Sequence, residues 1–366
     1  MAREASAGLT INGRFLSQPV TGVQRYAREI VCQLDQILYS EKKSVRLKAK
    51  IVGVPGTDTD FSRQAITLQH TPVGGGPVWD QIVLPFYNDG ILLSLCNQGP
   101  IASAKQIICI HDLNTVLAPQ SYSKSFRLLY NFTQPLLARR AAKLVTVSQF
   151  SARMLVEHRF CAADHIVVIP NGHEHVYRWD ATKADATFRR PQRRPYIFVL
   201  GSRARHKNVD VLLRAGPALD RMGIDVLVAG GTGSSFSQAN AQTSSPNVRY
   251  LGFVSDNDLA ALYKNALCFA FPSITEGFGL PALEALASGC PVIASEIPAL
   301  KEVCGDSALY ANPNSADDWI FCVELLAAHP ERAANLREKG LARAKAFSWR
   351  ASAEAYFGLV NEIGLS

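Results

Sequence analysis

Two glutamates that could do chemistry flank a glycine-bearing turn in the stretch SITEGFGLPALEALASGCPV, Ser273–Val292. Glu276 precedes the glycines Gly277 and Gly279, and Glu284 follows them. The apolar run before the turn is typical of a strand, and the run after it is typical of a helix that begins with proline. Because exposed N–H groups at a helix start attract phosphate, the turn predicts an anion site. The carboxylates would suit hydroxyl groups on either side of that phosphate, on a sugar and on a ribose.

Each glutamate also has an ordinary structural interpretation. Alone, Glu276 would be a loop charge, and Glu284 would complement the dipole of the helix. The pair, in a strand-turn-helix context with this arrangement of glycines and proline, favours the site.

The elements that must position these glutamates are alternating strands and helices. Short apolar runs are each followed by a helix-length amphipathic segment, as in QIICIHD, KLVTVSQ, HIVVIPNG, YIFVLGS, DVLVAGG, LCFAFPS and PVIAS. Continuous apolar strands of this kind are typical of parallel sheets covered on both faces. The sequence therefore predicts an α/β protein of two doubly wound units, with a polar, arginine-rich seam at Arg178–Pro195. Two such units facing one another would enclose a ligand-binding cleft.

The composition limits the class of protein. The chain has 366 residues, 48% of them hydrophobic, which is enough for two domains. No run approaches the roughly 20 apolar residues that cross a bilayer, and the opening residues lack the apolar core of a signal peptide. The eight cysteines have no metal-ligand spacing and indicate free thiols in a reducing cytosol. We expect a cytoplasmic protein, with a peripheral position at the inner face of the plasma membrane as an alternative.

The formal net charge of +7 gathers in three runs, Glu41–Lys50, Leu137–Lys143 and Phe188–Arg194. Such runs are ordinarily solvated faces, and the alternative is attraction to the phosphates of a nucleotide or an anionic lipid. We expect no nucleic-acid partner, because no interleaved aromatic residues, zinc spacing or recognition helix accompanies the charge.

The stretch EGFGLPALE resembles the glutamate-seven-residues-glutamate motif of the retaining glycosyltransferases of family 4. The similarity extends over most of the chain, through TGVQRYAREI, VSQFSARMLVEHRFCAADHIVVIPNG, NVRYLGFVSDNDLAALYKNA and PVIASEIPALKEVCGDSALYANP. The resemblance implies the GT-B fold, two facing Rossmann-like domains with a cleft between them. It implies an acceptor domain over 1–185, a nucleotide-sugar donor domain over 195–345, and a terminal helix over 346–366 that crosses back to the first domain.

The resemblance also implies donor-binding residues in the second domain. Glu276 would contact hydroxyls of the donor sugar, and Glu284 would bind the ribose of the nucleotide. Gly230, with Gly231 beside it, ends a strand and would line the nucleotide side. The backbone of the turn would line the donor and its diphosphate, at Gly277, Phe278, Gly279 and Leu280.

The family carries a basic pair that holds the departing diphosphate, and LGSRARHKNVDVLL places Lys207 at its lysine. A fixed cation there stabilises the negative charge that builds on the leaving group. Many members have arginine directly after the glycine, where this chain has Ser202. Either Arg203 takes that role, with Arg205 close by, or Lys207 acts with a different partner; a solvated basic turn is the ordinary interpretation.

In the first domain, ICIHDLN resembles the family's strand that ends in histidine and aspartate. His111 would sit near the reacting carbon and position the donor. It would not be the catalytic base, because the resemblance implies front-face attack, in which the departing phosphate takes the acceptor proton. Asp112 is equally explained as a cap of the turn. Gly22, in PVTGVQRYA, resembles the glycine loop that closes over the diphosphate, although many members have two glycines where this chain has Thr21 and Gly22.

The segments INGRFLSQPVTGVQRYA and IHDLN look most like bacterial mannosyltransferases that build surface polysaccharide or lipopolysaccharide. GDP-mannose is the expected donor, and UDP-glucose or UDP-N-acetylglucosamine is the alternative. The acceptor would be a lipid-linked oligosaccharide or lipopolysaccharide that contacts the first domain. The segment Ser121–Lys143 mixes aromatic, leucine and basic residues, as in a core helix or a helix that rests on anionic lipid.

We expect no cofactor and no metal, since the basic residues and the helix start can supply positive charge. The sequence DTD at Asp58–Asp60 is similar to a metal-binding motif of another glycosyltransferase fold, but it follows a loop-like stretch in the wrong domain. Two other functions stay open, a nucleotide-sugar epimerase of the same architecture and a non-catalytic nucleotide-sugar-binding protein.

Overall fold

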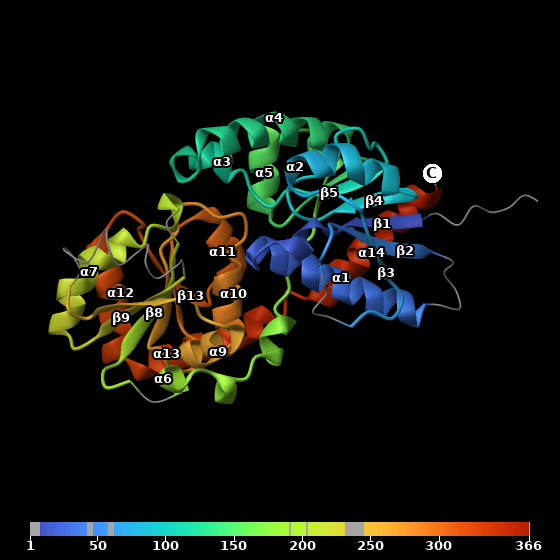
Figure 1. Ribbon diagram of the computed structural model, residues 1–366. Helices are drawn as coiled ribbons and strands as arrows, with labels where there is room; N and C mark the ends of the chain where they lie inside the picture. The colour runs from blue at the N-terminus through green and yellow to red at the C-terminus, as the bar shows by residue number, and fades with distance from the viewer. Residues whose placement is uncertain are drawn as a thin grey trace, which may run out of the picture. The chain divides into compact units, whose positions relative to one another are not determined.

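The computed structural model describes residues 8–41, 47–57, 62–189, 192–202, 204–230 and 245–365. They form two compact units, drawn in Figure 1. Unit 1 takes its residues from Met1–Leu113, Lys124–Gly172 and Ser348–Ser366, and unit 2 from Asn114–Ser123 and His173–Phe347. None of the described helices is long and apolar enough to span a membrane.

Unit 1 is built on a parallel sheet in the order β3-β2-β1-β4-β5-β6-β7. The order reverses direction between β1 and β4, so the carboxyl ends of these strands mark the point where open α/β sheets bind ligands. The strands are β1 (Gly8–Asn12), β2 (Lys48–Gly53), β3 (Thr67–His70), β4 (Gly90–Ser94), β5 (Gln106–Cys109), β6 (Lys143–Thr146) and β7 (Ile166–Val168).

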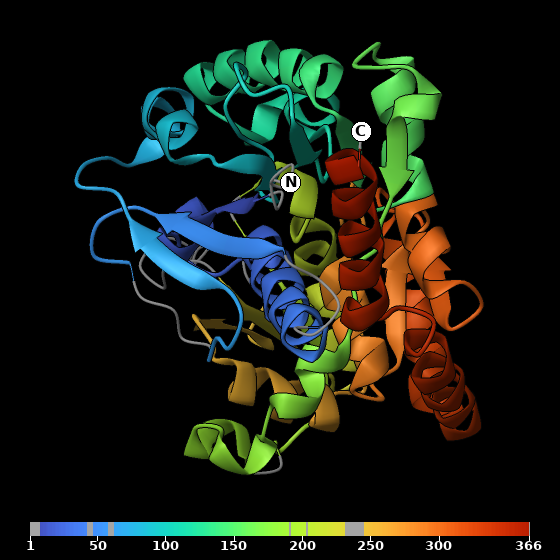
Figure 2. The same ribbon diagram turned by 90° about the vertical axis from the view of Figure 1, so that its right-hand side faces the viewer.

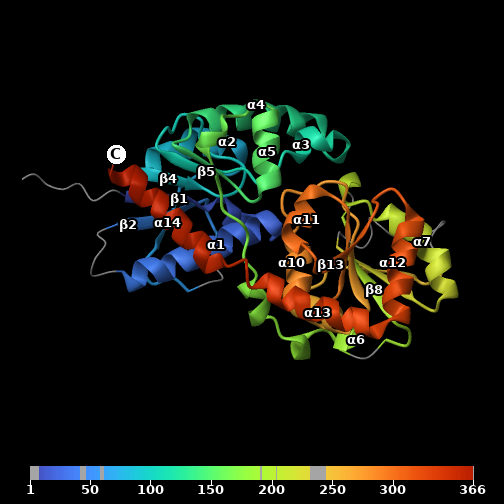
Figure 3. The ribbon, with the colours of Figure 1, turned by 180° about the vertical axis from the view of Figure 1, so that it is seen from behind.

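Helices cover both faces of this sheet. On one face α1 (Gly22–Ser40) and α14 (Trp349–Leu365) lie side by side (Figure 2). On the other face lie α4 (Lys124–Arg140) and α5 (Gln149–Glu157), as Figure 3 shows from behind. The hydroxyls of Tyr26 and Tyr356 are 2.9 Å apart, which joins α1 to α14. Shorter helical segments of unit 1 are η1 (Gly13–Ser17), α2 (Gly76–Val78), η2 (Trp79–Val83), η3 (Leu84–Tyr87) and η5 (Ala163–His165).

Unit 2 is built on a second parallel sheet, in the order β10-β9-β8-β11-β12-β13. Its order reverses between β8 and β11, so the loops after these two strands meet at the switch point. Its apolar core surrounds the fully buried Trp319. The strands are β8 (Tyr196–Leu200), β9 (Asp225–Ala229), β10 (Val248–Gly252), β11 (Cys268–Phe271), β12 (Val292–Ser295) and β13 (Ala308–Ala311).

The helical segments of unit 2 come from two parts of the chain. The segment Asn114–Ser123 supplies α3 (Asn114–Leu117) and η4 (Pro119–Ser121). The other segments within the described residues are η6 (Glu174–Arg178), η7 (Ala181–Lys183), α6 (Ala186–Arg189), η8 (Arg205–Lys207), α7 (Asp210–Arg221), α9 (Asp256–Asn265), α10 (Leu280–Ala287), α11 (Pro298–Cys304), α12 (Ala316–Ala328) and α13 (Pro330–Ala344). Two parallel-sheet α/β units confirm the predicted fold class.

After its first passage at Asn114–Ser123, the chain enters unit 2 again between Gly172 and His173, whereas the sequence placed the end of the first domain at residue 185. The reason is that the predicted seam contacts α9. The N–H of Asp180 donates to Asn257 Oδ1 at 2.8 Å, and the N–H of Asp185 donates to Asp258 Oδ1 at 2.7 Å. These hydrogen bonds attach the predicted seam to unit 2.

Candidate active site

The turn between β11 and α10 has a geometry that only glycine tolerates at Gly279. This residue caps α10 with φ of +101°, and a Cβ there would lie 2.4 Å from Leu300 Cδ2. Residues other than glycine rarely adopt such a φ. Pro281 follows in the first turn of the helix, where its missing N–H costs nothing. The predicted strand, turn and helix are therefore all present.

Glu276 and Lys207 meet at this turn. The Lys207 Nζ lies 2.7 Å from Glu276 Oε1, and the side chains are 25% and 10% exposed. The same Nζ lies 5.6 Å from the centre of the Phe271 ring. Lys207 ends η8, in the loop after β8, so the two strands at the switch point supply one partner each. An ammonium group has three donors, of which Glu276 takes one in this contact.

Glu284 lies within α10 and is paired with a residue that sequence reasoning missed. The Nε2 of His175 is 3.0 Å from Glu284 Oε1, and both residues are buried. Since an ionised carboxylate only accepts hydrogen bonds, His175 Nε2–H is the donor. The available signal was the pair of histidines in PNGHEH, directly after a predicted strand.

The side chains of Phe278 and Leu280 point into the protein. Each is 5% exposed, and the Phe278 ring meets that of Phe347 edge to face at 5.5 Å. Gly277 and Gly279 have no side chain to offer. Backbone is thus what these four residues can present to a ligand, and their donor-binding role stays a prediction.

Gly230 has a structural reason to be glycine. It follows β9 with φ of +110°, and a Cβ there would lie 2.1 Å from the carbonyl oxygen of Gly201. The close approach of the loops after β8 and β9 therefore accounts for this glycine without a ligand. Arg203, Gly231 and the Asp58–Asp60 motif lie outside the described residues.

The segment Asn114–Ser123 contacts the residue that precedes each member of the Lys207–Glu276 pair. The N–H of His206 donates to Ser121 Oγ at 3.0 Å, and the His206 ring stacks on Tyr122 at 6.0 Å. The hydroxyl of Thr275 donates to Asn114 Oδ1 at 3.3 Å. Sequence reasoning missed this segment as part of the site. Burial lowers the pKa of His206, and the charge of Lys207 lowers it further.

His111 lies after β5 in unit 1, buried and tightly held. Its N–H donates to Asn97 Oδ1 at 2.7 Å, and its Nε2 is 2.8 Å from the carbonyl oxygen of Leu95. The ring meets Tyr26 edge to face at 4.7 Å. Burial lowers the pKa of His111 to about 4. The ring is therefore neutral at pH 7. Its Nε2–H donates to the carbonyl oxygen of Leu95, and its Nδ1 is an acceptor. This arrangement suits positioning better than proton donation. Asp112, next in sequence, is half-buried.

Gly22 begins α1, but neither capping nor packing requires glycine there. Thr21 is the cap, and its N–H donates to Gln24 Oε1 at 3.3 Å. Apart from its chain neighbours and the backbone of α1, no atom of the described residues lies within 4 Å of a Cβ built on Gly22. The structure thus leaves open space where the sequence predicted that backbone approaches the diphosphate.

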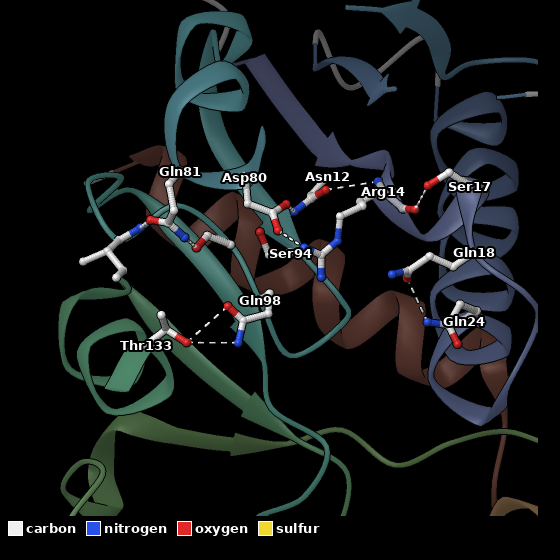
Figure 4. A network of polar contacts seen from close by, with 12 residues as sticks. Asn12, Arg14, Ser17, Gln18, Gln24, Asp80, Gln81, Ser94, Gln98 and Thr133 are labelled. Atoms are coloured by element: carbon white, nitrogen blue, oxygen red, sulfur yellow. Dashed lines mark hydrogen bonds and ion pairs between the residues drawn. The ribbon is translucent and has the colours of Figure 1, made fainter. Parts of the chain in front are cut away.

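A polar network fixes the loop that leads from β1 to Gly22 (Figure 4). Arg14 forms a buried ion pair with Asp80, which also accepts from Asn12 Nδ2 at 3.0 Å. Burial raises the pKa of Asp80, while Arg14 lowers it. Where this loop meets α1, Gln24 Nε2 in the helix donates to Gln18 Oε1 in the loop at 2.9 Å.

Two hollows lie away from the predicted residues. One, of about 670 Å³, is at the amino-terminal ends of β8 and β9 and is lined by Ala186, Thr187, Gln192, Arg193, Arg194, Asp225, Pro246 and Arg249. The other, of about 580 Å³, lies between α5 and β7. Across the described ranges, no group of three histidine, cysteine, aspartate or glutamate residues could hold a metal ion.

Comparisons with known proteins all point to one class of enzyme. The family described as glycosyl transferases group 1 matches residues 180–343, which contain Lys207, Glu276 and Glu284. O-antigen chain mannosyltransferase B of Escherichia coli is 31% identical over 260 residues, which are 67% of either chain. O-antigen chain mannosyltransferase RfbU of Salmonella typhimurium is 26% identical over 254 residues, 69% of either chain.

Solved structures extend the likeness to nearly the whole chain. Sucrose-phosphate synthase from Thermosynechococcus elongatus superposes with a TM-score of 0.71 at 19% identity, covering 98% of this chain and 99% of its own. WaaG, a glycosyltransferase involved in lipopolysaccharide biosynthesis, gives 0.69 at 15% identity, covering 96% and 99%. At these identities the likeness establishes the fold alone, which is that of GT-B glycosyltransferases.

Proposed function

Because this chain belongs to the group 1 glycosyltransferases, we propose that it transfers mannose from GDP-mannose, with retention of configuration, to a lipid-linked oligosaccharide or lipopolysaccharide. The two relatives described above are both named as O-antigen chain mannosyltransferases, which supports mannose as the sugar. The observation that carries the proposal is the contact between Lys207 and Glu276 beside the glycine turn.

In the proposed complex, the donor diphosphate lies at the start of α10. Backbone N–H groups of the turn and the Lys207 ammonium bind phosphate oxygens, and Glu276 accepts hydrogen bonds from sugar hydroxyls. Glu284, within α10, binds the ribose on the nucleotide side. The ion pair with Lys207 keeps the Glu276 carboxylate oriented when the donor is absent.

The proposed chemistry is attack of an acceptor hydroxyl oxygen on the anomeric carbon, from the side on which the diphosphate leaves. The bond from that carbon to the phosphate oxygen breaks, and the departing phosphate takes the acceptor proton. Lys207 stabilises the charge that builds on the phosphate, an effect that in other enzymes contributes about 3–4 kcal/mol per fixed donor. No metal ion enters this scheme, because Lys207 and the helix start supply the positive charge.

His111 has a positioning role in this proposal. The ring is neutral and its Nε2–H donates to the carbonyl oxygen of Leu95. Its Nδ1 can therefore accept a hydrogen bond from a hydroxyl of the donor sugar. It does not compete with the phosphate for the acceptor proton.

A membrane-associated acceptor is supported by the surface of α4. Phe126, Leu128 and Phe132 are 37%, 74% and 66% exposed, and Lys124, Arg139 and Arg140 lie on the same helix. Apolar side chains with flanking cations favour the interface of an anionic bilayer. We therefore propose a peripheral position of the protein at a membrane. The variant Leu128→Glu/Phe132→Glu should lose sedimentation with anionic liposomes but keep its stabilisation by GDP-mannose in the thermal-shift assay; equal sedimentation of the variant and the unmodified protein would contradict this proposal.

The proposed donor is tested with a panel of GDP- and UDP-sugars in thermal-shift and nucleotide-release assays, with membrane extract as the source of acceptor. We expect GDP-mannose to stabilise the protein and GDP release to need both acceptor and Glu276. If only UDP-sugars are active, the transferase stands and the donor is replaced. An isomerised sugar nucleotide without release would indicate an epimerase, and binding without turnover would indicate a binding protein.

A further inference from the structure

The carboxylate of Glu284 is held by a turn from a distant part of the chain. His175 lies in η6, and its Nε2 is 3.0 Å from Glu284 Oε1, across 109 positions of sequence. The side chains are 0% and 6% exposed, so bulk water screens the contact little. The ring of Trp179 packs edge to face on His175 at 5.3 Å. His175 is thus fixed on its own side of the contact.

The same turn has anchors that do not involve Glu284. The Nε2 of His173 is 2.8 Å from the Tyr177 hydroxyl, and its Nδ1 bonds the carbonyl oxygen of Phe347. Phe347 in turn packs on Phe278, in the turn before α10. The position of His175 relative to α10 is therefore set by several contacts, of which the bond to Glu284 is one.

A glutamate side chain without such a bond has three rotatable angles and several orientations of its carboxylate. The hydrogen bond to His175 selects among them. A carboxylate has about four lone-pair sites, so it can accept the bond from His175 together with further hydrogen bonds. A ribose presents two adjacent hydroxyl donors, which match acceptor directions only when the carboxylate is held in one orientation.

We propose that His175 is a positioning residue for recognition of the nucleotide ribose, acting by holding the Glu284 carboxylate in the orientation that accepts the ribose hydroxyls. The inference rests on the proposed function, in which Glu284 binds the ribose. It adds a residue outside the glycine turn and predicts that discrimination between ribose and deoxyribose depends on His175.

The test compares ligands with and without ribose hydroxyls. Dissociation constants of GDP, UDP and their 2′,3′-dideoxy forms are measured by calorimetry for the unmodified protein, His175→Phe and His175→Gln. Hydrogen bonds to a charged group predict that the unmodified protein prefers the ribose form of its nucleotide by about 10- to 150-fold. In His175→Phe this ratio should fall below about 3-fold, with the dideoxy affinity unchanged. In His175→Gln, whose amide N–H reaches a similar point, most of the ratio should return.

A matched control comes from the same turn. His173→Phe disturbs the anchors of η6 but not the donor to Glu284, so it should lower the melting temperature and keep the ribose preference. If His175→Phe does not fold, His175→Asn replaces it, since its shorter amide cannot reach Glu284.

Two results would overturn the inference alone: a ribose preference that survives in His175→Phe, or an equal loss of affinity for ribose and dideoxy forms. A third result has a wider reach. If the unmodified protein binds both forms equally, the ribose role of Glu284 is wrong and this inference falls with it. Transfer of the sugar is judged separately, by acceptor-dependent nucleotide release.

Discussion

Lys207 and Glu276 lie 69 positions apart in sequence and form one ion pair, with Nζ 2.7 Å from Oε1, where the loops after β8 and β11 meet. The pair has a structural value and a proposed catalytic one. Removing either partner leaves the other charge partly buried and unpaired, which costs about 1–3 kcal/mol of stability. Loss of activity in a single variant is therefore ambiguous by itself.

The first prediction separates the two effects with a double variant. Lys207→Met and Glu276→Gln should each lower the free energy of unfolding, and Lys207→Met/Glu276→Gln should recover most of it, because no unpaired charge remains. All three should lose about 100- to 1,000-fold in kcat, because each lacks a residue that the proposed mechanism places at the diphosphate or at the sugar. Urea unfolding and nucleotide release measure the two quantities. A double variant with restored activity would show that the pair serves stability alone.

The glycine turn could be predicted from sequence because its determinants are local. Three determinants lie close together in the chain: the continuous apolar residues of β11, the proline in the first turn of α10, and the glycine at a position of positive φ. The partners of the turn could not be predicted in this way. His175 is 109 positions from Glu284, and Asn114 is 161 positions from Thr275, so their contacts depend on the order of strands in the sheet.

The strands show the same limit. Buried strands such as β8 and β12 are continuous apolar runs and were predicted from sequence. In β2 the lysines Lys48 and Lys50 alternate with apolar residues. From the sequence this segment was interpreted as a basic run, and no strand was predicted there. Strand β3 lies at the edge of the sheet, and most of its residues are polar and exposed. It therefore has no apolar pattern from which a strand could be predicted.

The second prediction concerns Gly22. Alanine is favoured over glycine within a helix by about 1 kcal/mol, and open space surrounds the missing Cβ, so Gly22→Ala should leave stability unchanged or raise it. If the diphosphate approaches this backbone, the methyl group should raise KM for the donor about tenfold. Gly358→Ala, in α14 with equally open space, is the matched control and should keep activity. Unchanged kinetics in Gly22→Ala would remove Gly22 from the donor site.

The third prediction concerns the segment Asn114–Ser123. Ser121→Ala removes the acceptor of the His206 N–H, next to Lys207, and one neutral hydrogen bond contributes about 1 kcal/mol. We expect kcat/KM for the donor to fall about 3- to 10-fold, with little change in melting temperature. Gln120→Ala, an exposed position of the same segment, should have no effect. Equal kinetics for the two variants would show that the segment does not position the lysine loop.

The last prediction follows from the pKa of His111, which burial lowers from 6.5 to about 4. Between these two values the unfolded chain binds the proton and the folded protein does not, so stability falls as the pH drops below 6.5 and this effect is complete near pH 4. At pH 5 the loss should be about 2 kcal/mol relative to pH 7. His111→Gln has no such group, and its unfolding free energy, measured in urea at both pH values, should change by about 2 kcal/mol less than that of the unmodified protein. The same change in both proteins would mean that His111 titrates normally. Its Nδ1 would then carry a proton in mildly acidic solution and could not act as the acceptor that the proposed positioning role requires.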